Sequence, residues 1–214
     1  MKNSLVNKKI LITAGPTWVP LDDVRVISNI SSGELGVLLA KTAEDCSLKV
    51  DLFLGPSGPL YSPDNIHVRR FKYFDDFVSL VHRQLEMKKY DIILHCAAVS
   101  DYIARRTPGK ISSLSKELVL KLIQAPKIID RIRRLNPKAF LVMFKLESGV
   151  PIRSLIKRTQ EAMRKHKVDL AVANMFTKKG YLGLIVDESH VLAKAVSRKQ
   201  LAKKLFEVLK QRIH

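Results

Sequence analysis

The sequence predicts an α/β fold in which a mostly parallel central sheet lies between two layers of helices. Short runs rich in β-branched residues alternate with longer segments whose apolar residues recur at helical spacing, and this alternation is typical of βαβ units. A chain of 214 residues is long enough for one sizeable hydrophobic core and short for two. We therefore predict a single domain over residues 1–214, a Rossmann-like three-layer sandwich with a small β-hairpin near the C-terminus.

Each predicted element is a periodic segment bounded by glycine, proline or polar residues. The predicted strands are Lys9–Thr13, Val50–Leu54, His67–Phe71, Asp91–Cys96, Phe140–Leu146 and Asp169–Ala173. The predicted helices are Gly33–Cys46, Phe74–Met87, Pro126–Leu135, Ile152–His166 and Ser197–Ile213. The segment YLGLIVDESHVLA (Tyr181–Ala193) is predicted to form the hairpin, and the polar, basic stretch Arg105–Lys116 a mobile loop.

Composition excludes several classes of protein. No apolar run approaches the roughly 20 residues that a helix needs to cross a bilayer, and the N-terminus MKNSLVNKK lacks the apolar segment of a signal peptide. Cys46 and Cys96 form neither a C-x-x-C pair nor a disulfide framework. We therefore expect a reduced, cytoplasmic setting and no membrane partner.

The net charge of +18 favours partners that carry negative charge, such as nucleic acid or phosphorylated small molecules. The basic residues are spread over the polar faces of several predicted helices and do not form one directed patch. Aromatic residues make up only 7% of the chain and do not alternate with basic ones, as they do where bases stack. Charge alone is therefore weak support for nucleic-acid binding.

Ligands of doubly wound sheets bind beyond the carboxyl ends of the strands, so a site is expected in the loops after Thr13, Leu54, Cys96 or Leu146. An NAD(P)-dependent oxidoreductase would need G-x-G-x-x-G beside the first strand and an acidic residue at the end of the second. Here the first turn reads TAGPTW and the second strand ends in LFLGPSG, so both signals are missing. The sequence also lacks P-loop, G-x-S-x-G and H-E-x-x-H motifs, and its scattered histidines predict no metal site formed by the protein alone.

Ser31, Ser32 and Gly33 open the first predicted helix and favour binding of a phosphate group. A helix N-terminus presents free backbone N–H groups and the positive end of the macrodipole, although Ser31 or Ser32 would also serve as an ordinary N-cap. Asn29 offers a donor and an acceptor in one side chain, which suits a carbonyl or carboxylate, and Arg25 is a candidate anion clamp. The long arm PTWVPLDDVRV before this turn is consistent with a loop that reaches over a substrate.

These motifs together resemble those of the phosphopantothenoylcysteine synthetase family, the ligases of coenzyme A biosynthesis. LITAGPTWVPLDDVRVISNISSGELG is similar to the family's opening signature, DIILHCAAVSDY to its alanine-rich strand end, and GKISS to its mobile lysine loop. LIQAPKII, FKLES and DLAVAN follow in the family's order. The resemblance runs from about Lys9 to the C-terminal helix, and six ordered motifs are far more specific than any one of them.

The resemblance implies a ligase that joins 4′-phosphopantothenate to L-cysteine. In the family, the substrate carboxylate attacks the α-phosphate of a nucleoside triphosphate, pyrophosphate leaves, and the cysteine amine attacks the acyl-nucleotide. The spacing of PLDDVRVISN is that of the bacterial members, which use CTP, whereas FKLES and AAVSDY are closer to the stand-alone type, which uses ATP; CTP is the nucleotide we expect. Mg²⁺ would be held by the triphosphate. The resemblance also implies a homodimer, for which the YLGLIV segment offers a contact.

The resemblance assigns roles to residues by their place in the motifs. Asn29 and Lys110 would be catalytic: Asn29 would hold the acyl group, and Lys110 would neutralise the phosphates from its loop. Arg25 and Ala98 would join Asn29 in contacting the substrate. The predicted nucleotide-binding residues are Gly15, Ser31, Ser32, Gly33, His95, Cys96, Ala97, Asp101, Lys110, Pro126, Lys127, Ile128, Ile129, Phe144 and Lys165.

Three features depart from the family pattern. The turn GPT replaces the commoner Gly-Gly-Thr, so Pro16 removes a backbone N–H donor there. Glu34 follows SSG, where a basic residue is frequent, and places an acid near the expected phosphates. Ala162 and His166 align with two lysines that contact the triphosphate in bacterial members, so Arg158 or Lys165 would have to replace them. Many bacterial members also carry a flavin-dependent decarboxylase domain in front, and we expect another protein to supply that activity here.

Taken singly, these residues have plainer interpretations. Lys110 would be a solvated lysine, Asp101 a turn residue and Phe144 a core residue. Two alternative functions therefore remain beside the ligase. One is the NAD(P)-dependent oxidoreductase, and the other is a basic nucleic-acid-binding protein on a decayed ligase scaffold, which the charge of +18 would favour.

Overall fold

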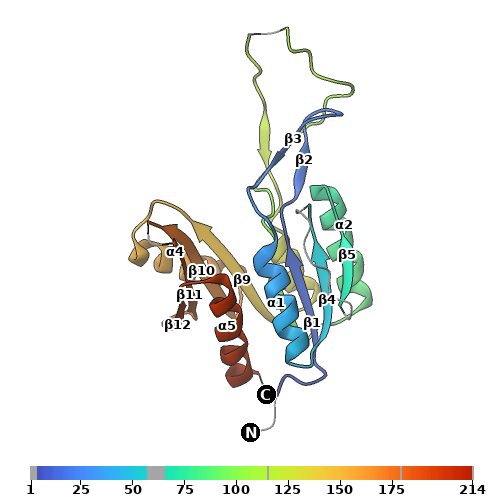
Figure 1. The fold of residues 1–214 in the computed structure, drawn as a ribbon. Coiled ribbons are helices and arrows are strands. Elements are labelled where there is room, and N and C mark those ends of the chain that lie inside the picture. The colour runs from blue at the N-terminus through green and yellow to red at the C-terminus, as the bar shows by residue number, and fades with distance from the viewer. Residues whose placement is uncertain (1–3, 57–65, 115, 179, 214) are drawn as a thin grey trace.

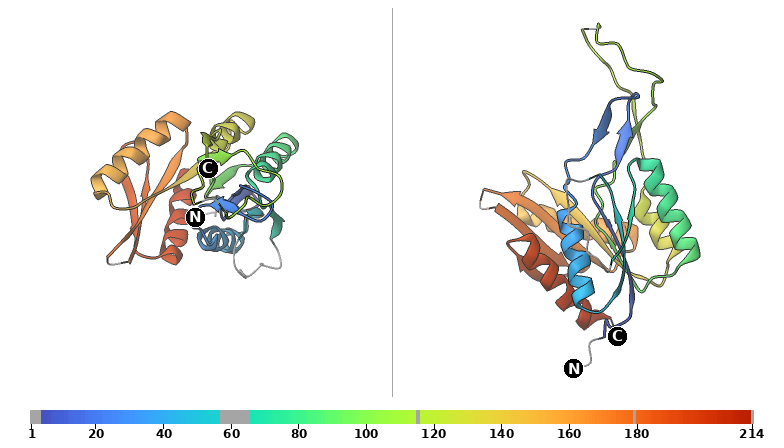
Figure 2. Two further views of the ribbon diagram at one scale, coloured as in Figure 1. Left: turned by 90° about the horizontal axis from the view of Figure 1, so that it is seen from above. Right: turned by 45° about the vertical axis from the view of Figure 1, so that its right-hand side comes forward.

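The computed structural model describes residues 4–56, 66–114, 116–178 and 180–213. Figures 1 and 2 show one central sheet with helices on both of its faces, which is the three-layer arrangement that the sequence predicts. The two described ends of the chain lie together at one edge of this sheet, and the projecting segments lie at the other (Figure 1).

The sheet is mostly parallel, with its strands in the order β12-β11-β10-β9-β6-β1-β4-β5. The strand bounds are β1 Lys9–Ala14, β4 Lys49–Leu54, β5 His67–Arg70, β6 Ile92–His95, β9 Phe140–Glu147, β10 Leu170–Thr177, β11 Gly180–Val186 and β12 Val191–Ala195. All pairs from β10 to β5 are parallel, whereas β11 and β12 are antiparallel to their neighbours. The predicted C-terminal hairpin is therefore confirmed, and it extends the main sheet.

The order of the strands creates a switch point between β1 and β6. The chain builds outward from β1 to β4 and β5, and then returns to add β6, β9 and β10 on the other side of β1. The connections after β1 and β6 consequently leave the sheet in opposite directions. In open α/β sheets, ligands bind at this point, beyond the carboxyl ends of the strands.

The helices in the described part of the chain form two layers, each with its own apolar core. Helices α1 (Glu34–Asp45) and α5 (Arg198–Arg212) pack together on one face, and α2 (Phe74–Met87), α3 (Ile128–Leu135) and α4 (Ile152–His166) cover the other. Successive strand residues point to opposite faces. In β1, Ile10 and Ile12 accordingly join the core under α1 and α5, whereas Leu11 joins the core under α2, α3 and α4.

Two short strand pairs extend beyond the carboxyl edge of the sheet. Strand β2 (Trp18–Pro20) pairs with β3 (Val26–Ser28), and β7 (Tyr102–Ala104) pairs with β8 (Leu122–Gln124), both in antiparallel fashion. Figure 1 shows β2 and β3 projecting above the sheet, with the chain that leaves β7 beside them. We call residues 16–30 together with residues 102–114 and 116–124 the arm.

The predicted strands and helices agree with the structure to within one residue at each end, except at the arm and at two ends. Helices Phe74–Met87 and Ile152–His166 are confirmed at both ends. The strand predicted at Asp169–Ala173 continues to Thr177, because β10 pairs with β9 on one side and β11 on the other. The helix predicted from Pro126 begins at Ile128, because Lys127 is still extended. The four arm strands were not predicted, since strands of three residues are too short to show a period.

Candidate functional site

The segments that follow β1 and β6 stay paired beyond the sheet. The N–H of Ala98 donates to the carbonyl of Gly15 (2.9 Å), and the N–H of Thr17 donates to the carbonyl of Ala98 (3.3 Å). Thr17 also binds Ser100 through a contact of 3.0 Å between the two hydroxyl oxygens. The segments AGPT (residues 14–17) and AAVS (residues 97–100) of two sequence motifs therefore lie side by side at the switch point.

Gly36 brings helix α1 unusually close to β1. A Cβ at Gly36 would lie 2.2 Å from the Cβ of Ala14, closer than two carbon atoms can approach. Gly33, just before the helix, has φ of +74°, in the left-handed region that favours glycine. Together they set the first turn of α1 directly against the carboxyl end of β1.

The SSG turn caps α1 differently from the expectation. Gly33 is the N-cap residue, and the serines bond within the turn: the Ser31 hydroxyl accepts from the N–H of Gly33 and the Ser32 hydroxyl from the N–H of Glu34, each at 3.4 Å. These bonds are long and easily exchanged for a ligand. The turn also lies at the positive end of the helix macrodipole, which favours an anion.

Glu34 is paired with a cation from the other end of the chain. Its carboxylate accepts a hydrogen bond from the Arg198 guanidinium at 2.8 Å. Arg198 also lies over the rings of Phe176 and Tyr181, at 5.5 and 5.7 Å from their centroids. The acid that departed from the family pattern is thus neutralised by Arg198, which sequence reasoning did not single out.

Asn29 connects the arm to the segment after β6. Its side-chain amide donates to the carbonyls of Ala98 (3.2 Å) and Val99 (3.1 Å). The predicted substrate-binding residues Asn29 and Ala98 are therefore brought together. Because both N–H groups of the amide point to backbone carbonyls, the Oδ1 atom of Asn29 remains directed to other partners.

His95 and Cys96 end β6 as uncharged groups. Burial lowers the pKa of His95 to about 4, and the Thr13 hydroxyl lies 2.9 Å from its Nδ1 atom. The same hydroxyl accepts the N–H of Ala97 at 3.2 Å. Burial also raises the pKa of the Cys96 thiol to about 12. Both side chains therefore shape this edge of the site without carrying charge at neutral pH, and Thr13 is a supporting residue that the motifs did not reveal.

Asp101 and Lys127 join two other predicted motifs. The Lys127 ammonium donates to the Asp101 carboxylate at 2.6 Å, and both side chains are substantially exposed. Pro126 is exposed beside them, whereas the side chains of Ile128 and Ile129 are buried in the core under α2, α3 and α4. Contact between a nucleotide and these two isoleucines would have to use their backbone.

The remaining predicted nucleotide residues lie farther apart. Phe144 packs partly buried against the core under α1 and α5. Lys165 lies in the last turn of α4, which returns the chain from the carboxyl end of β9 to the amino end of β10. The structure therefore does not bring Lys165 to the carboxyl edge with the other residues. Arg158 lies closer to that edge, because its guanidinium binds Glu147 at the end of β9 (2.9 Å).

Ala162 and His166, which align with the two lysines of bacterial members, lie on the same helix as Lys165. Ala162 packs partly against the core under α4, and His166 lies with Lys165 in the last turn of the helix. The Nδ1 atom of His166 is 2.6 Å from Asp130 of α3. This end of α4 is occupied by helix-to-helix contacts.

Arg25 and Lys110 meet at the tip of the arm. Arg25 follows the β2–β3 turn, and its guanidinium lies 3.5 Å from Asp22 in that turn. The loop with Lys110 is not free as predicted, because the N–H groups on both sides of Lys110 donate to Asp22 and Asp23. The Arg25 guanidinium is thus paired with an acid, whereas at Lys110 the acids hold only the neighbouring backbone.

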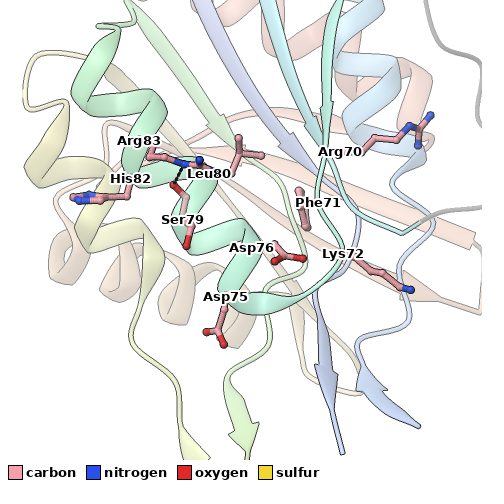
Figure 3. A pocket seen from close by; sticks show the side chains of 9 residues that line it. All are labelled: Arg70, Phe71, Lys72, Asp75, Asp76, Ser79, Leu80, His82 and Arg83. Carbon is pink, nitrogen blue, oxygen red and sulfur yellow. Dashed lines mark hydrogen bonds between the residues drawn. The ribbon is translucent and has the colours of Figure 1, made fainter. Parts of the chain in front are cut away.

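A pocket of about 910 Å³ opens between the end of β5 and the start of α2. Figure 3 shows that residues of both charges line it, with Arg70 and Lys72 coming from β5 and the segment after it, and Asp75 and Asp76 from the start of α2. None of the predicted site residues lines this pocket. The candidate site is instead the open edge formed by the ends of β1 and β6, the start of α1 and the arm.

The described residues contain no group of three or more His, Cys, Asp or Glu placed to hold a metal ion. Among the same residues, no helix has the length and apolar character required to cross a membrane. Neither cysteine forms a disulfide.

A family described as the C-terminal domain of the DNA/pantothenate metabolism flavoproteins matches residues 5–213. The chain belongs to this family. Its relatives include the coenzyme A biosynthesis bifunctional protein CoaBC of Thermococcus kodakarensis, which is 38% identical over 80% of this chain and 42% of its own length. The CoaBC protein of Methanocaldococcus jannaschii is 30% identical over 95% of this chain and 50% of its own length.

Several solved structures share the fold. A DNA/pantothenate metabolism flavoprotein from Streptococcus pneumoniae has a TM-score of 0.86 at 25% identity, covering 97% of this chain and 100% of the other. A Cab2 mutant in complex with phosphopantothenate-cysteine has a TM-score of 0.77 at 17% identity, covering 99% and 88%. The resemblance to phosphopantothenoylcysteine synthetases is confirmed. The chain spans about half the length of the bifunctional relatives it matches.

Proposed function

We propose that this chain joins 4′-phosphopantothenate to L-cysteine in coenzyme A biosynthesis. The observation that carries the proposal is the convergence of family motifs at the β1–β6 switch point, where Asn29 of the arm reaches the carbonyls after β6. Family membership supports the same reaction. The oxidoreductase alternative has no comparable support, since β4, the second strand of the main sheet along the chain, ends at Leu54 and is followed by Gly55, with no acid for a ribose.

In the first step, the substrate carboxylate attacks the α-phosphate, a P–O bond forms, and the bond to pyrophosphate breaks. In the second step, the cysteine amine attacks the acyl carbon, the nucleoside monophosphate leaves, and the amine loses a proton. Both steps concentrate negative charge, so they depend on positioning and on aimed donors. We assign the acyl group to the Asn29 amide, which would exchange a backbone carbonyl for the acyl oxygen. We assign the phosphates to Lys110, Arg25 and the SSG turn.

We propose CTP as the nucleotide, as the spacing of PLDDVRVISN favours. Asp101 and Lys127 would contact it, since a ligand phosphate or ribose can replace one partner of an exposed ion pair at small cost. Mg²⁺ would enter on the triphosphate, whose oxygens suit its octahedral coordination, and would add positive charge there.

The test is pyrophosphate release by the purified chain with Mg²⁺, comparing CTP with ATP, with and without phosphopantothenate and cysteine. We expect release that requires phosphopantothenate, is faster with CTP, and yields phosphopantothenoylcysteine detectable by mass. A folded chain that releases no pyrophosphate with either nucleotide would refute the proposal. In that case, a salt-dependent shift of labelled RNA that is insensitive to Asn29→Asp would support the nucleic-acid alternative.

Two variants test the assigned roles. Lys110→Ala should abolish turnover without unfolding the chain, whereas Lys116→Ala, an exposed lysine farther along the same segment, should leave turnover unchanged. Asn29→Asp should stall the reaction after nucleotide transfer, so that acyl-nucleotide accumulates. A variant at Asn29 that releases no pyrophosphate would place its role before that step.

We further propose a homodimer in the cytoplasm, with residues 1–214 acting as one domain. In the YLGLIV segment, which the resemblance suggested as the contact, Leu182 to Val186 are already buried in a strand inside the sheet. The arm instead exposes many apolar side chains, which a second copy would cover. These are Val24, Val26, Ile30, Leu114, Leu118, Val119, Leu122 and Ile123. Light scattering should give twice the chain mass, and Val119→Asp should reduce it to a single chain.

A further inference from the structure

The turn between β2 and β3 holds the loop that carries Lys110, although the two segments are far apart in sequence. At the tip of the turn, Asp23 accepts hydrogen bonds from the Arg106 guanidinium (2.6 Å) and from the backbone N–H of Gly109 (3.1 Å). The N–H of Asp23 in turn donates to the carbonyl of Gly109 (3.1 Å). One exposed aspartate thus makes three contacts to the residues just before Lys110.

Asp22 holds the other side of Lys110. Its Oδ2 atom accepts the N–H of Ile111 at 3.0 Å, while its Oδ1 atom accepts the N–H groups of Val24 (2.9 Å) and Arg25 (2.7 Å). Burial acts to raise the pKa of Asp22, but these N–H groups and the Arg25 guanidinium outweigh it and lower the pKa, so the carboxylate stays ionised. A single carboxylate therefore connects the turn of the arm with the loop.

The backbone on both sides of Lys110 is fixed, whereas its side chain is exposed. Gly109 has φ of +73°, and a Cβ there would meet no atom within 4 Å. The glycine is thus required by the left-handed backbone that directs its N–H to Asp23, and not by lack of space. A lysine held at its backbone and free at its ammonium group is arranged to meet a ligand.

We infer that Asp23, together with Asp22, is a positioning residue that docks the Lys110 loop on the arm in the orientation used for catalysis. The inference rests on the proposed role of Lys110 and extends it. Docking places Lys110 beside Arg25, because the two neighbouring N–H groups of Ile111 and Arg25 share one carboxylate. The two residues that we assign to the phosphates are thereby held at the same turn of the arm.

The test uses Asp23, which is half exposed, because substitution of the buried Asp22 would threaten folding. Asp23→Ala removes the carboxylate from both Arg106 and the Gly109 N–H, and Arg106→Ala removes the ion pair alone. Arg105→Ala is the matched control, since none of its contacts in the described residues involves Asp23. Deuterium uptake of the 106–111 peptide reports docking, and pyrophosphate release reports catalysis.

We expect Asp23→Ala to lower kcat about 10-fold, since misplacing a catalytic group by about 1 Å costs between 10- and 100-fold. The KM for L-cysteine should stay within about twofold and the melting temperature within about 2 °C, because an exposed pair contributes little to stability. Deuterium uptake should rise in Asp23→Ala, rise less in Arg106→Ala, and stay at the wild-type level in Arg105→Ala.

Two results would overturn the inference while leaving the ligase proposal in place. One is an active wild type in which Lys110→Ala abolishes turnover but Asp23→Ala is as active as the wild type or more so. The other is deuterium uptake of the 106–111 peptide that stays at the wild-type level in Asp23→Ala. A wild type without ligase activity would instead overturn the proposed function and, with it, the catalytic role of the docked loop.

Discussion

Substitution of Gly36 by alanine should displace the first turn of α1 and with it the SSG turn. The new Cβ would lie 2.2 Å from the Cβ of Ala14 and 3.2 Å from its Cα. Carbon atoms in contact prefer about 3.5–4.0 Å, so the helix must move away from β1 by more than about 1 Å. The strain of overpacking is about 1–3 kcal/mol, and the better helix propensity of alanine offsets at most about 1 kcal/mol.

We therefore expect Gly36→Ala to lower the free energy of unfolding by about 1–2 kcal/mol, which corresponds to a fall in melting temperature of roughly 2–8 °C for a chain of this size. Turnover should fall more than stability implies, by about 10-fold or more, because the SSG turn, to which we assign the phosphates, has moved. Val168→Ala is the control for stability. Val168 is buried beside the amino end of β10, so its truncation should cost a similar 1–2 kcal/mol at about 25 cal/mol per Å² of lost apolar area, without affecting the site.

Calorimetry gives the melting temperatures of Gly36→Ala and Val168→Ala, and steady-state pyrophosphate release gives their turnover. An unchanged or raised melting temperature for Gly36→Ala would show that the close approach of α1 to β1 relaxes without cost. Equal losses of turnover in Gly36→Ala and Val168→Ala would show that activity follows stability alone. Either result would refute the argument that Gly36 sets the position of the site.

Three further predictions follow from the contacts of single residues. Asp187 has a pKa lowered to about 2, because N–H groups and a guanidinium outweigh the effect of its burial; Asp187→Asn should cost about 1–2 kcal/mol at pH 7. That difference should be complete above pH 4 and vanish as the pH falls through 2, as measured by urea unfolding. Lys127→Ala should raise the KM for the nucleotide several-fold while shifting stability by less than about 0.5 kcal/mol, because its pair with Asp101 is exposed; equal KM values would remove Lys127 from the site. Cys96, with its pKa raised to about 12, should react with iodoacetamide at pH 8 at least about tenfold more slowly in the folded chain than in urea, and equal rates would contradict its burial.

The sequence predicts the location of the site because that location follows from local patterns and one topological rule. Apolar periodicity defines Phe74–Met87 and Ile152–His166 at both ends, and the alternation of strands and helices defines a parallel sheet. Ligands then bind at the carboxyl edge. Ala98, which lies just after a predicted strand, and Asn29, which lies just before the first predicted helix, were accordingly predicted and are found together.

The sequence does not predict the contacts that hold the site, because they join distant segments without a local signal. Asp23 and Arg106 are 83 residues apart, and Glu34 and Arg198 are 164 apart. Lys165 is a case in which a sequence motif predicted a contact that the fold does not allow. The motif order suggested a phosphate contact, yet a helix that connects two parallel strands must end at their amino edge, so Lys165 lies away from the other candidates. The predicted order of strands and helices alone therefore places Lys165 at the amino edge.

The ion pairs at the carboxyl edge share an energetic property that bears on how anions bind there. Asp23 with Arg106, Asp101 with Lys127, and Glu34 with Arg198 are all substantially exposed. An exposed pair contributes only about 0–1 kcal/mol, so freeing one of its cations costs little. A charge-assisted bond from a cation to a phosphate is roughly twice as strong as a neutral hydrogen bond. Weakly bound carboxylates therefore keep these cations ordered near the site. The phosphate groups of a nucleotide would bind the cations more strongly and displace the carboxylates.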